Sequence, residues 1–201
     1  IVARDAQAGA PVQQYLIAVN SDDEKLKSKY LESSKPKITA MAEQRDNPLA
    51  WYLLSLENND LKLLYKAAKG GNVQALNAMG TIAIQEAMTL KNISSNQQEK
   101  VFCKAFDCFR RAAAERDPNG FINLGTCYLR GIGCRQDPVM AFESFASAAK
   151  AGHPEGMDYV SAAYQNGHGV KKNDKLSLWW RMKARSLRGD KNAAKWLKER
   201  K

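Results

Sequence analysis

Apolar residues recur at helical spacing through most of this chain. In the second half, Ala and Phe positions follow one another at intervals of three or four residues, which places them on one face of a helix. The alternation of apolar and polar residues that is typical of strands is absent from the sequence. The pattern therefore predicts an all-α protein whose amphipathic helices pack through their apolar faces.

The apolar pattern repeats at a fixed interval of 36 residues. The positions Ala105, Phe106, Phe109, Ala112 and Ala113 return as Ala141, Phe142, Phe145, Ala148 and Ala149. The match continues through the pairs Pro118 and Pro154, Tyr128 and Tyr164, Gly131 and Gly167, and Gly133 and Gly169. A weaker third copy contains Ser177, Leu178 and Ala184. A fixed period of this length is the signature of stacked helical repeats.

Each regular unit predicts a helix hairpin. The first helix ends near Arg116, and Pro118 opens the second, because a proline at the first helical position loses no backbone hydrogen bond. The second helix runs to about Tyr128. Gly131 and Gly133 then allow the positive backbone angles of a tight reversal into the next unit. We expect the hairpins to stack into an α/α superhelical solenoid.

The first half follows the repeat less closely. Ser21 and Glu24 have the spacing of a capping box, so we expect a helix from Asp22 to about Ser33. Pro36 is expected to break the chain or to open another helix. Farther on, a spacing of 45 residues between units indicates an insertion over residues 85–99.

We predict a single helical-repeat domain over residues 1–201. Its parts are divergent N-terminal repeats at 1–60, a divergent repeat with an insertion at 61–104, regular repeats at 105–140 and 141–175, and a basic C-terminal repeat or cap at 176–201.

These motifs resemble the Sel-one-like repeat (SLR) family, a relative of the tetratricopeptide repeat. The family pattern is visible in Ala105, Phe109, Arg111, Ala112, Ala113, Leu124, Gly125, Tyr128, Gly131 and Gly133. The next unit carries Ser161 where the pattern has a helix glycine, and we expect a looser helix contact there. The resemblance implies a non-enzymatic scaffold or adaptor that binds a partner protein. It also implies a bacterial source and a role in envelope processes, secretion or host contact, which favours a periplasmic, secreted or host-translocated protein over a cytoplasmic one.

In this family the first helices are expected to line the concave face of the solenoid. The candidate binding residues on these helices are Lys62, Lys66, Arg110, Arg111, Glu143, Ser147, Trp179, Arg181 and Lys183. Trp and Arg often dominate the energetics of interfaces, so Trp179 with Arg181 and Arg111 is the sharpest candidate set. The alternative is that Trp179 covers a terminal core.

The net charge of +10 comes almost entirely from the C-terminal end. Residues 171–201 hold twelve Lys or Arg against Asp174, Asp190 and Glu199. This bias favours an acidic partner, although a solvated terminal helix would show the same bias. The second functional hypothesis is that this segment binds nucleic acid or an anionic membrane. It ranks below a protein partner because no nucleic-acid motif is recognisable.

No chemistry-bearing motif stands out in the sequence. Patterns of serine hydrolases, Walker-type nucleotide sites and dinucleotide sites are lacking, so we predict no enzyme, no catalytic residue, no metal and no cofactor. His153 and His168 fall in turns and are expected to be solvated. No apolar stretch reaches the length of a membrane span. The start at Ile1 is typical of a processed product or a fragment.

All four cysteines fall within one repeat. Counting outward from the hairpin turn at Pro118, Cys108 and Cys127 form an inner pair, and Cys103 and Cys134 form an outer pair. Two disulfides, 108 to 127 and 103 to 134, would require α-carbon separations below about 7 Å. Four free thiols that act as small apolar side chains are the alternative. A zinc site is least expected, because the spacings are longer than those of structural zinc sites. A cysteine-rich branch of the SLR family does carry disulfides, but closer to the turn.

Overall fold

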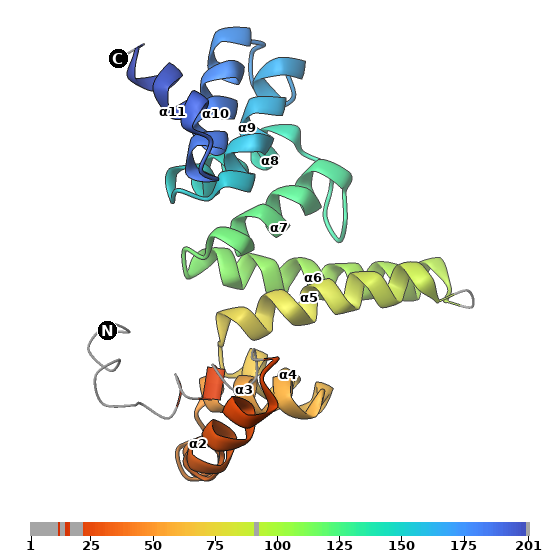
Figure 1. The fold of residues 1–201 in the computed structure, drawn as a ribbon. Helices are drawn as coiled ribbons and strands as arrows, with labels where there is room; N and C mark the ends of the chain where they lie inside the picture. Colours follow the sequence, from red (N-terminus) through yellow and green to blue (C-terminus); the bar gives the residue numbers. More distant parts are fainter. Residues whose placement is uncertain (1–11, 13–14, 17–21, 91–92, 200–201) are drawn as a thin grey trace. The chain divides into compact units, whose positions relative to one another are not determined.

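The computed structural model describes residues 12, 15–16, 22–90 and 93–199, and every regular element within these ranges is an α-helix (Figure 1). The helices with defined bounds are α2 (Glu24–Arg45), α3 (Pro48–Asn58), α4 (Leu61–Lys69), α5 (Val73–Thr89), α6 (Ser95–Ala114), α7 (Pro118–Arg130), α8 (Pro138–Lys150), α9 (Pro154–Asn166), α10 (Asp174–Leu187) and α11 (Lys191–Lys198). The prediction of an all-α repeat fold is confirmed.

The chain divides into two compact units, Ile1–Met79 and Gly80–Lys201. The boundary lies within α5, so the first half of this helix belongs to the first unit and its second half to the second. It also lies inside the predicted repeat 61–104. The repeat boundaries that we derived from the sequence stay predictions.

In the first unit, α2 is one continuous helix of 22 residues, so the break expected at Pro36 was wrong. A proline inside a helix removes one backbone hydrogen bond and costs about 3 kcal/mol. The helix continues because its later turns bury Ile38 and Ala42 completely. The capping box expected at Ser21 falls outside the described residues. At the start of α2, Asp23 Oδ1 accepts a hydrogen bond from the backbone N–H of Lys25 at 2.9 Å.

The helices of the first unit enclose a small apolar core. Its buried members are Tyr15, Ile38, Ala42, Ala50, Leu53 and Leu54. At the edge of this core the carboxylate of Glu57 accepts hydrogen bonds from the Tyr15 hydroxyl at 2.5 Å and from the Lys35 ammonium at 2.6 Å. Burial, with a further contribution from Glu57, raises the pKa of Tyr15 well above its usual value. Tyr15 therefore stays neutral while its hydroxyl donates the hydrogen bond to Glu57 of α3.

In the second unit, consecutive helices from α6 to α11 pack against one another (Figure 1). The expected hairpin boundaries are confirmed: α7 begins at Pro118 and α9 at Pro154. Each of these helices ends at a glycine in the left-handed region, Gly131 with φ 70° and Gly167 with φ 77°. The backbone carries out the same reversal twice because the same residue types stand at the same repeat positions.

Aromatic rings of one repeat pack onto glycines of the repeat before it. A Cβ added to Gly125 would lie 2.7 Å from the ring of Phe145, and one added to Gly80 would lie 2.6 Å from the ring of Phe109. The looser contact expected at Ser161, the equivalent position in the repeat 141–175, was wrong. Ser161 is buried, and its hydroxyl donates to the backbone carbonyl of Ser177 at 2.8 Å.

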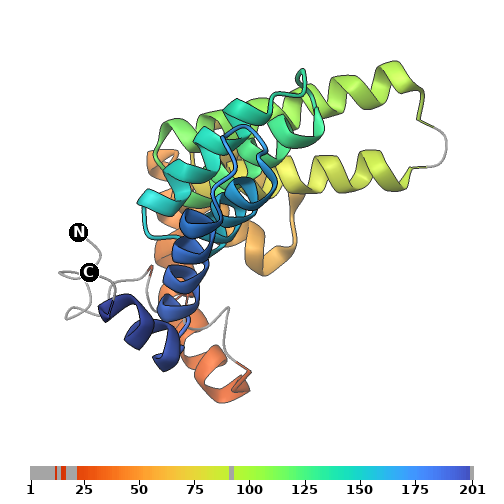
Figure 2. The same ribbon diagram turned by 90° about the horizontal axis from the view of Figure 1, so that it is seen from above.

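The insertion lengthens one hairpin. α6 has 20 residues and the α5 helix 17, against 13 in α7, α8 and α9. A capping box starts α6, since Ser94 and Gln97 satisfy each other's backbone N–H groups. Figure 2 shows this hairpin projecting away from the later helices of the unit.

Candidate functional site

The first helices of successive repeats in the second unit, α6, α8 and α10, carry equivalent rows of polar side chains. One row contains Asp107, Glu143 and Trp179, and the next contains Arg111, Ser147 and Lys183, each spaced by 36 residues. The row members are acidic and basic on α6, acidic and neutral on α8, and aromatic and basic on α10. The last repeat therefore differs most in surface chemistry.

Three residues on α10, Lys175, Trp179 and Lys183, are four residues apart in turn and share one helix face. We call them the α10 stripe. The Trp179 side chain is 36% exposed, and its ring meets that of Trp180 edge to face at 4.8 Å between centroids. The ammonium of Lys183 lies 4.8 Å from the Trp179 ring centroid and 5.2 Å from that of Trp180. These cation–π contacts hold Lys183 against an exposed indole.

The acidic side chains of the last repeat are already engaged. Asp190 pairs with Arg185 at 2.6 Å, Asp174 with Lys172 at 3.8 Å and Glu199 with Lys195 at 3.9 Å. The backbone N–H of Ala193, with a smaller contribution from Arg185, holds the pKa of Asp190 below its ordinary value.

Several lysines of the same region are left without an ion pair. Within residues 93–199, Lys171, Lys175, Lys183, Lys191 and Lys198 have no carboxylate within ion-pair distance. The positive charge predicted at this end of the chain is therefore only partly neutralised inside the molecule.

The other candidates in the second unit are held by local contacts. Arg110 pairs with Asp107 on its own helix at 2.6 Å. Arg181 donates a hydrogen bond to Gln165 of α9 at 2.7 Å, which directs its guanidinium toward the preceding helix. Ser147 donates to the backbone carbonyl of Glu143 at 2.9 Å, and the Glu143 side chain is exposed. Trp179 therefore contacts Lys183, whereas Arg181 contacts Gln165 of the preceding helix.

The candidates Lys62 and Lys66 belong to the first unit. Lys62 is exposed near the start of α4. The ammonium of Lys66 lies 3.7 Å from the Trp51 ring centroid and 3.2 Å from Asp46 Oδ1. Trp51 Nε1 donates to the same oxygen at 3.1 Å. The hydrogen bond from Trp51 and the charge of Lys66 lower the pKa of Asp46, so this cluster is held together within its own unit.

The structure adds one residue to the candidates predicted from the sequence. Lys175 lies one helical turn before Trp179, at the end of the α10 stripe. The four-residue spacing of Lys175, Trp179 and Lys183 was a visible signal, but only the indole contacts of Lys183 identify this face.

The four cysteines are unpaired in the structure. Cys127 is buried, and burial raises its pKa to about 12. The loop that contains Cys134 approaches Cys103, because a Cβ on Gly133 would lie 2.7 Å from the backbone nitrogen of Cys103. Burial and the neighbouring Cys103 both raise the pKa of Cys134. The pairings 103 to 134 and 108 to 127 stay predictions.

The two histidines differ in their surroundings. His168 is exposed, as expected, but the expectation of a solvated His153 was wrong. His153 is half-buried at the start of α9, and its Nδ1 atom is buried without a hydrogen-bond partner. Across the described parts of the chain, no group of three or more His, Cys, Asp or Glu side chains could hold a metal ion.

Comparison with known sequences places the regular repeats in a family. The Sel1 repeat family matches residues 98–117, 122–153 and 154–180. Residues 98–180 of the chain therefore carry Sel1 repeats. Sel1-repeat proteins generally mediate protein–protein interactions and are typically non-catalytic scaffolds. The matched residues of this Sel1-repeat protein include both tryptophans of α10.

A solved structure of a bacterial protein shows the same fold as the repeats. The Sel1-repeat protein is similar to a Sel1 repeat protein from Oxalobacter formigenes, with a TM-score of 0.54 and 25% identity over 64% of this chain and 91% of that one. It is also similar to cysteine rich protein B of Helicobacter pylori, with a TM-score of 0.45 and 23% identity over 65% and 92%. A protective antigen of uropathogenic Escherichia coli strains with an SLR fold gives a TM-score of 0.43 and 18% identity over 89% of this chain and 46% of that one.

A helix that spans a membrane needs about 20 mostly apolar residues. Within the part of the chain that the structure describes, no helix is long and apolar enough to cross a bilayer.

Proposed function

We propose that this Sel1-repeat protein is a non-enzymatic scaffold or adaptor that binds a partner protein along its first helices, with the α10 stripe as the main contact. The observation that carries the proposal is the exposed indole of Trp179 with the Lys183 ammonium held against it. Exposed tryptophans beside fixed cations are typical of residues that dominate binding energy.

The chemistry of the α10 stripe indicates an acidic partner segment. Lys175 and Lys183 have no ion pair within residues 93–199, so their charges are available to carboxylates of a partner. Complementary charge of this kind accelerates association and selects among partners. The Trp179 ring adds apolar area that ions alone do not supply.

The rows on α6 and α8 would extend the contact. The concave face of a helical solenoid is formed by equivalent helices, so a bound segment that follows it meets Asp107 and Arg111, then Glu143 and Ser147, before it reaches α10. Because these rows carry both signs of charge, they would set the direction in which the segment lies. The basic α10 end of these rows would then receive the acidic end of the segment.

Charge reversal with a matched control tests the proposal. In a double variant Lys175→Glu and Lys183→Glu, binding of a labelled peptide of glutamates with one central phenylalanine should weaken at least tenfold, measured by fluorescence anisotropy. The control Lys191→Glu and Lys198→Glu changes the net charge equally but lies on α11, and should weaken binding less than threefold. Equal losses in both variants, or a lower melting temperature in the stripe variant, would sink the assignment.

A second candidate function is binding of nucleic acid or an anionic membrane by the basic end of the chain. This function is favoured by three lysines outside the α10 stripe that lack ion pairs among the described residues: Lys171, Lys191 and Lys198. Single-stranded RNA and phosphatidylserine vesicles are the probes. Binding to either that falls steeply with rising salt, and that is lost equally in both double variants, would put this function first.

For the biological setting we propose a bacterial protein that acts in envelope processes, secretion or contact with a host. The Sel1 repeat protein of similar structure from Oxalobacter formigenes supports the bacterial source. Fractionation of the source cells, followed by detection of the protein in the periplasm or medium, tests the setting. Recovery from the cytoplasm alone would contradict it.

A further inference from the structure

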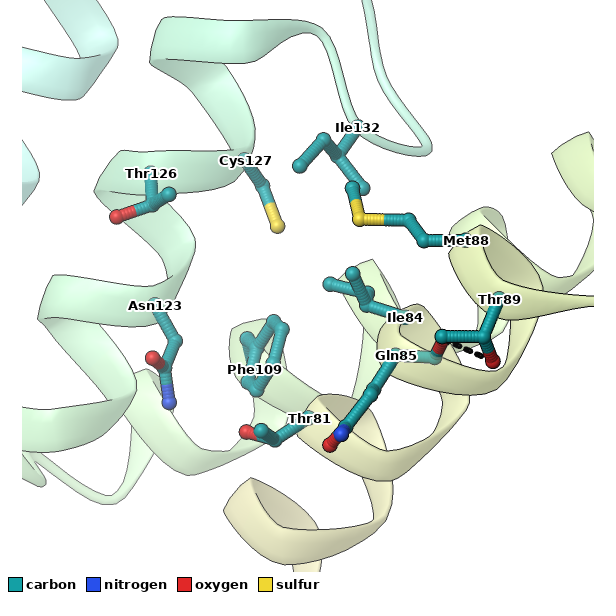
Figure 3. Close-up of a pocket in the computed structure, with 10 residues that line it drawn as sticks. All are labelled: Thr81, Ile84, Gln85, Met88, Thr89, Phe109, Asn123, Thr126, Cys127 and Ile132. Carbon is teal, nitrogen blue, oxygen red and sulfur yellow. Dashed lines mark hydrogen bonds between the residues drawn. The ribbon is translucent and has the colours of Figure 1, made fainter.

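The second unit contains an open cavity of about 460 Å³ between α5 and α7 (Figure 3). Phe109 of α6 forms its floor, and Ile84, Met88 and Ile132 form apolar walls. Asn123 and other neutral polar side chains complete the lining, and none of the lining residues is charged. A cavity of this size and chemistry is typical of a site for an apolar group with one polar atom.

The next repeat has a cavity at the equivalent position, and it is almost filled. Between α7 and α9 only about 50 Å³ remains. Phe145 and Tyr159 line it, at the positions equivalent to Phe109 and Asn123 after 36 residues. The two repeats thus have a cavity at the same position, which is open in the first repeat and almost filled in the second.

One of the differences between the two cavities is the residue over the phenylalanine ring. The ring of Tyr159 stacks on Phe145, with centroids 4.2 Å apart and planes at 10°. In the preceding repeat Asn123 replaces the tyrosine and has no ring to place over Phe109. The repeat geometry therefore still provides the space of an aromatic ring, but the chain does not supply the ring.

We propose that the cavity between α5 and α7 binds a tyrosine or phenylalanine side chain of a partner protein, in the place that Tyr159 occupies one repeat later. The uncharged lining complements a neutral ring and would exclude a carboxylate or an ammonium. The neutral amide of Gln85, which also lines the cavity, can donate a hydrogen bond to a phenolic hydroxyl or accept one from it.

This site shares no residue with the α10 stripe, so the two proposals can fail separately. The cavity selects a neutral aromatic group, and the stripe selects acidic groups. A partner that uses both would bind the Sel1-repeat protein at two chemically distinct points.

Binding of para-cresol, the free molecule that corresponds to the tyrosine side chain, tests the site. Methyl signals of Ile84, Met88 and Ile132 in NMR spectra should shift on titration, with a Kd of about 1–10 mM for a group of this size. The methyl signal of the buried Met157, which does not line the cavity, should not move. Absence of shifts at the three lining residues would overturn the proposal.

Substitutions then decide where the ring sits. Asn123→Tyr supplies the missing ring and should weaken para-cresol binding at least tenfold, and Tyr159→Asn should create a second site. Should Asn123→Tyr not fold, Met88→Glu at a 57% exposed position places a charge at the cavity and should have the same effect on binding. Unchanged affinity in the folded variants would overturn the assignment.

Two peptides distinguish a partner's side chain from a free small molecule. Acetyl-Gly-Tyr-Gly-amide should shift the same methyl signals as para-cresol, and acetyl-Gly-Lys-Gly-amide should not. Binding of para-cresol without binding of the tyrosine peptide would overturn the proposal of a protein partner. The Lys175→Glu and Lys183→Glu double variant should bind para-cresol as the unsubstituted protein does, whatever its effect on the acidic peptide.

Discussion

The ring of Tyr159 lies flat on the ring of Phe145, with centroids 4.2 Å apart and an interplanar angle of 10°. The two residues belong to the helices of one hairpin, α9 and α8. Phe145 in turn packs onto Gly125 of the preceding repeat. The stack therefore joins packing inside a hairpin to packing between hairpins.

Replacement of this ring should weaken the fold. Tyr159→Asn removes the stack and leaves a cavity, so we expect the free energy of unfolding to fall by about 2–4 kcal/mol. Urea unfolding followed by circular dichroism measures it. Tyr65→Asn, at a 60% exposed position, is the matched control and should change stability by less than about 0.5 kcal/mol. A loss at Tyr159 no greater than that at Tyr65 would contradict the role of the stack.

The glycine of the loop after α7 should not tolerate a side chain. Gly133 has φ 65°, and an added Cβ would lie 2.2 Å from the carbonyl oxygen of Phe102. Gly152 also has a positive φ, 88°, but an added Cβ would meet nothing within 4 Å. Gly152→Ala should cost about 1 kcal/mol from backbone strain alone, and Gly133→Ala should cost at least about 2 kcal/mol more. Equal losses in thermal unfolding would show that the loop can move away from α6.

A single cap substitution should stabilise the protein. His153 is the N-cap residue of α9 but makes no side-chain hydrogen bond to the helix. In the preceding repeat Asp117 holds this position and accepts the N–H of Gly120 at 2.7 Å. His153→Asp should therefore raise the free energy of unfolding by about 1 kcal/mol at pH 7. The same change at the exposed His168 should leave the melting temperature unaltered, and a fall at His153 would show that its ring packs favourably.

The four thiols should react in an order set by burial. In native protein treated with a thiol-specific disulfide reagent, the exposed Cys103 should react first and the buried Cys127 only after unfolding. Because burial raises the pKa of Cys127 from about 9 to about 12, the folded state favours the neutral thiol. The neutral Cys127 thiol therefore stabilises the folded state at neutral pH, and this stabilisation is lost as pH rises from about 9 to about 12. Faster unfolding in urea at pH 7 than at pH 10 would contradict this sign.

Mild oxidation and peptide mapping test the predicted disulfides. The approach of Gly133 to Cys103 favours the pair 103 to 134 over 108 to 127. Cys108→Ser should leave that product unchanged, and Cys134→Ser should abolish it. A product that contains Cys108 would contradict the preference.

Local signals in the sequence were sufficient to place the starts of α7 and α9 and the turns that follow these helices. The prolines at 118 and 154 and the glycines after each second helix act through their own backbone preferences, which do not depend on distant residues. The interval of 36 residues then determined that these helices recur as equivalent pairs. The Sel1 repeat could therefore be recognised from the order of residues alone.

Other features required the tertiary structure, because they depend on residues that the sequence does not relate. The helix passes through Pro36 because burial of Ile38 and Ala42 outweighs a lost hydrogen bond. The cavity above Phe109 depends on which side chain a different helix presents to it. By itself the sequence determined the repeat, its hairpins and its basic end. The sequence places Tyr159 and Asn123 at equivalent positions, but only packing decided that this position lies over Phe145 and Phe109, since stacking needs two side chains brought together by the fold.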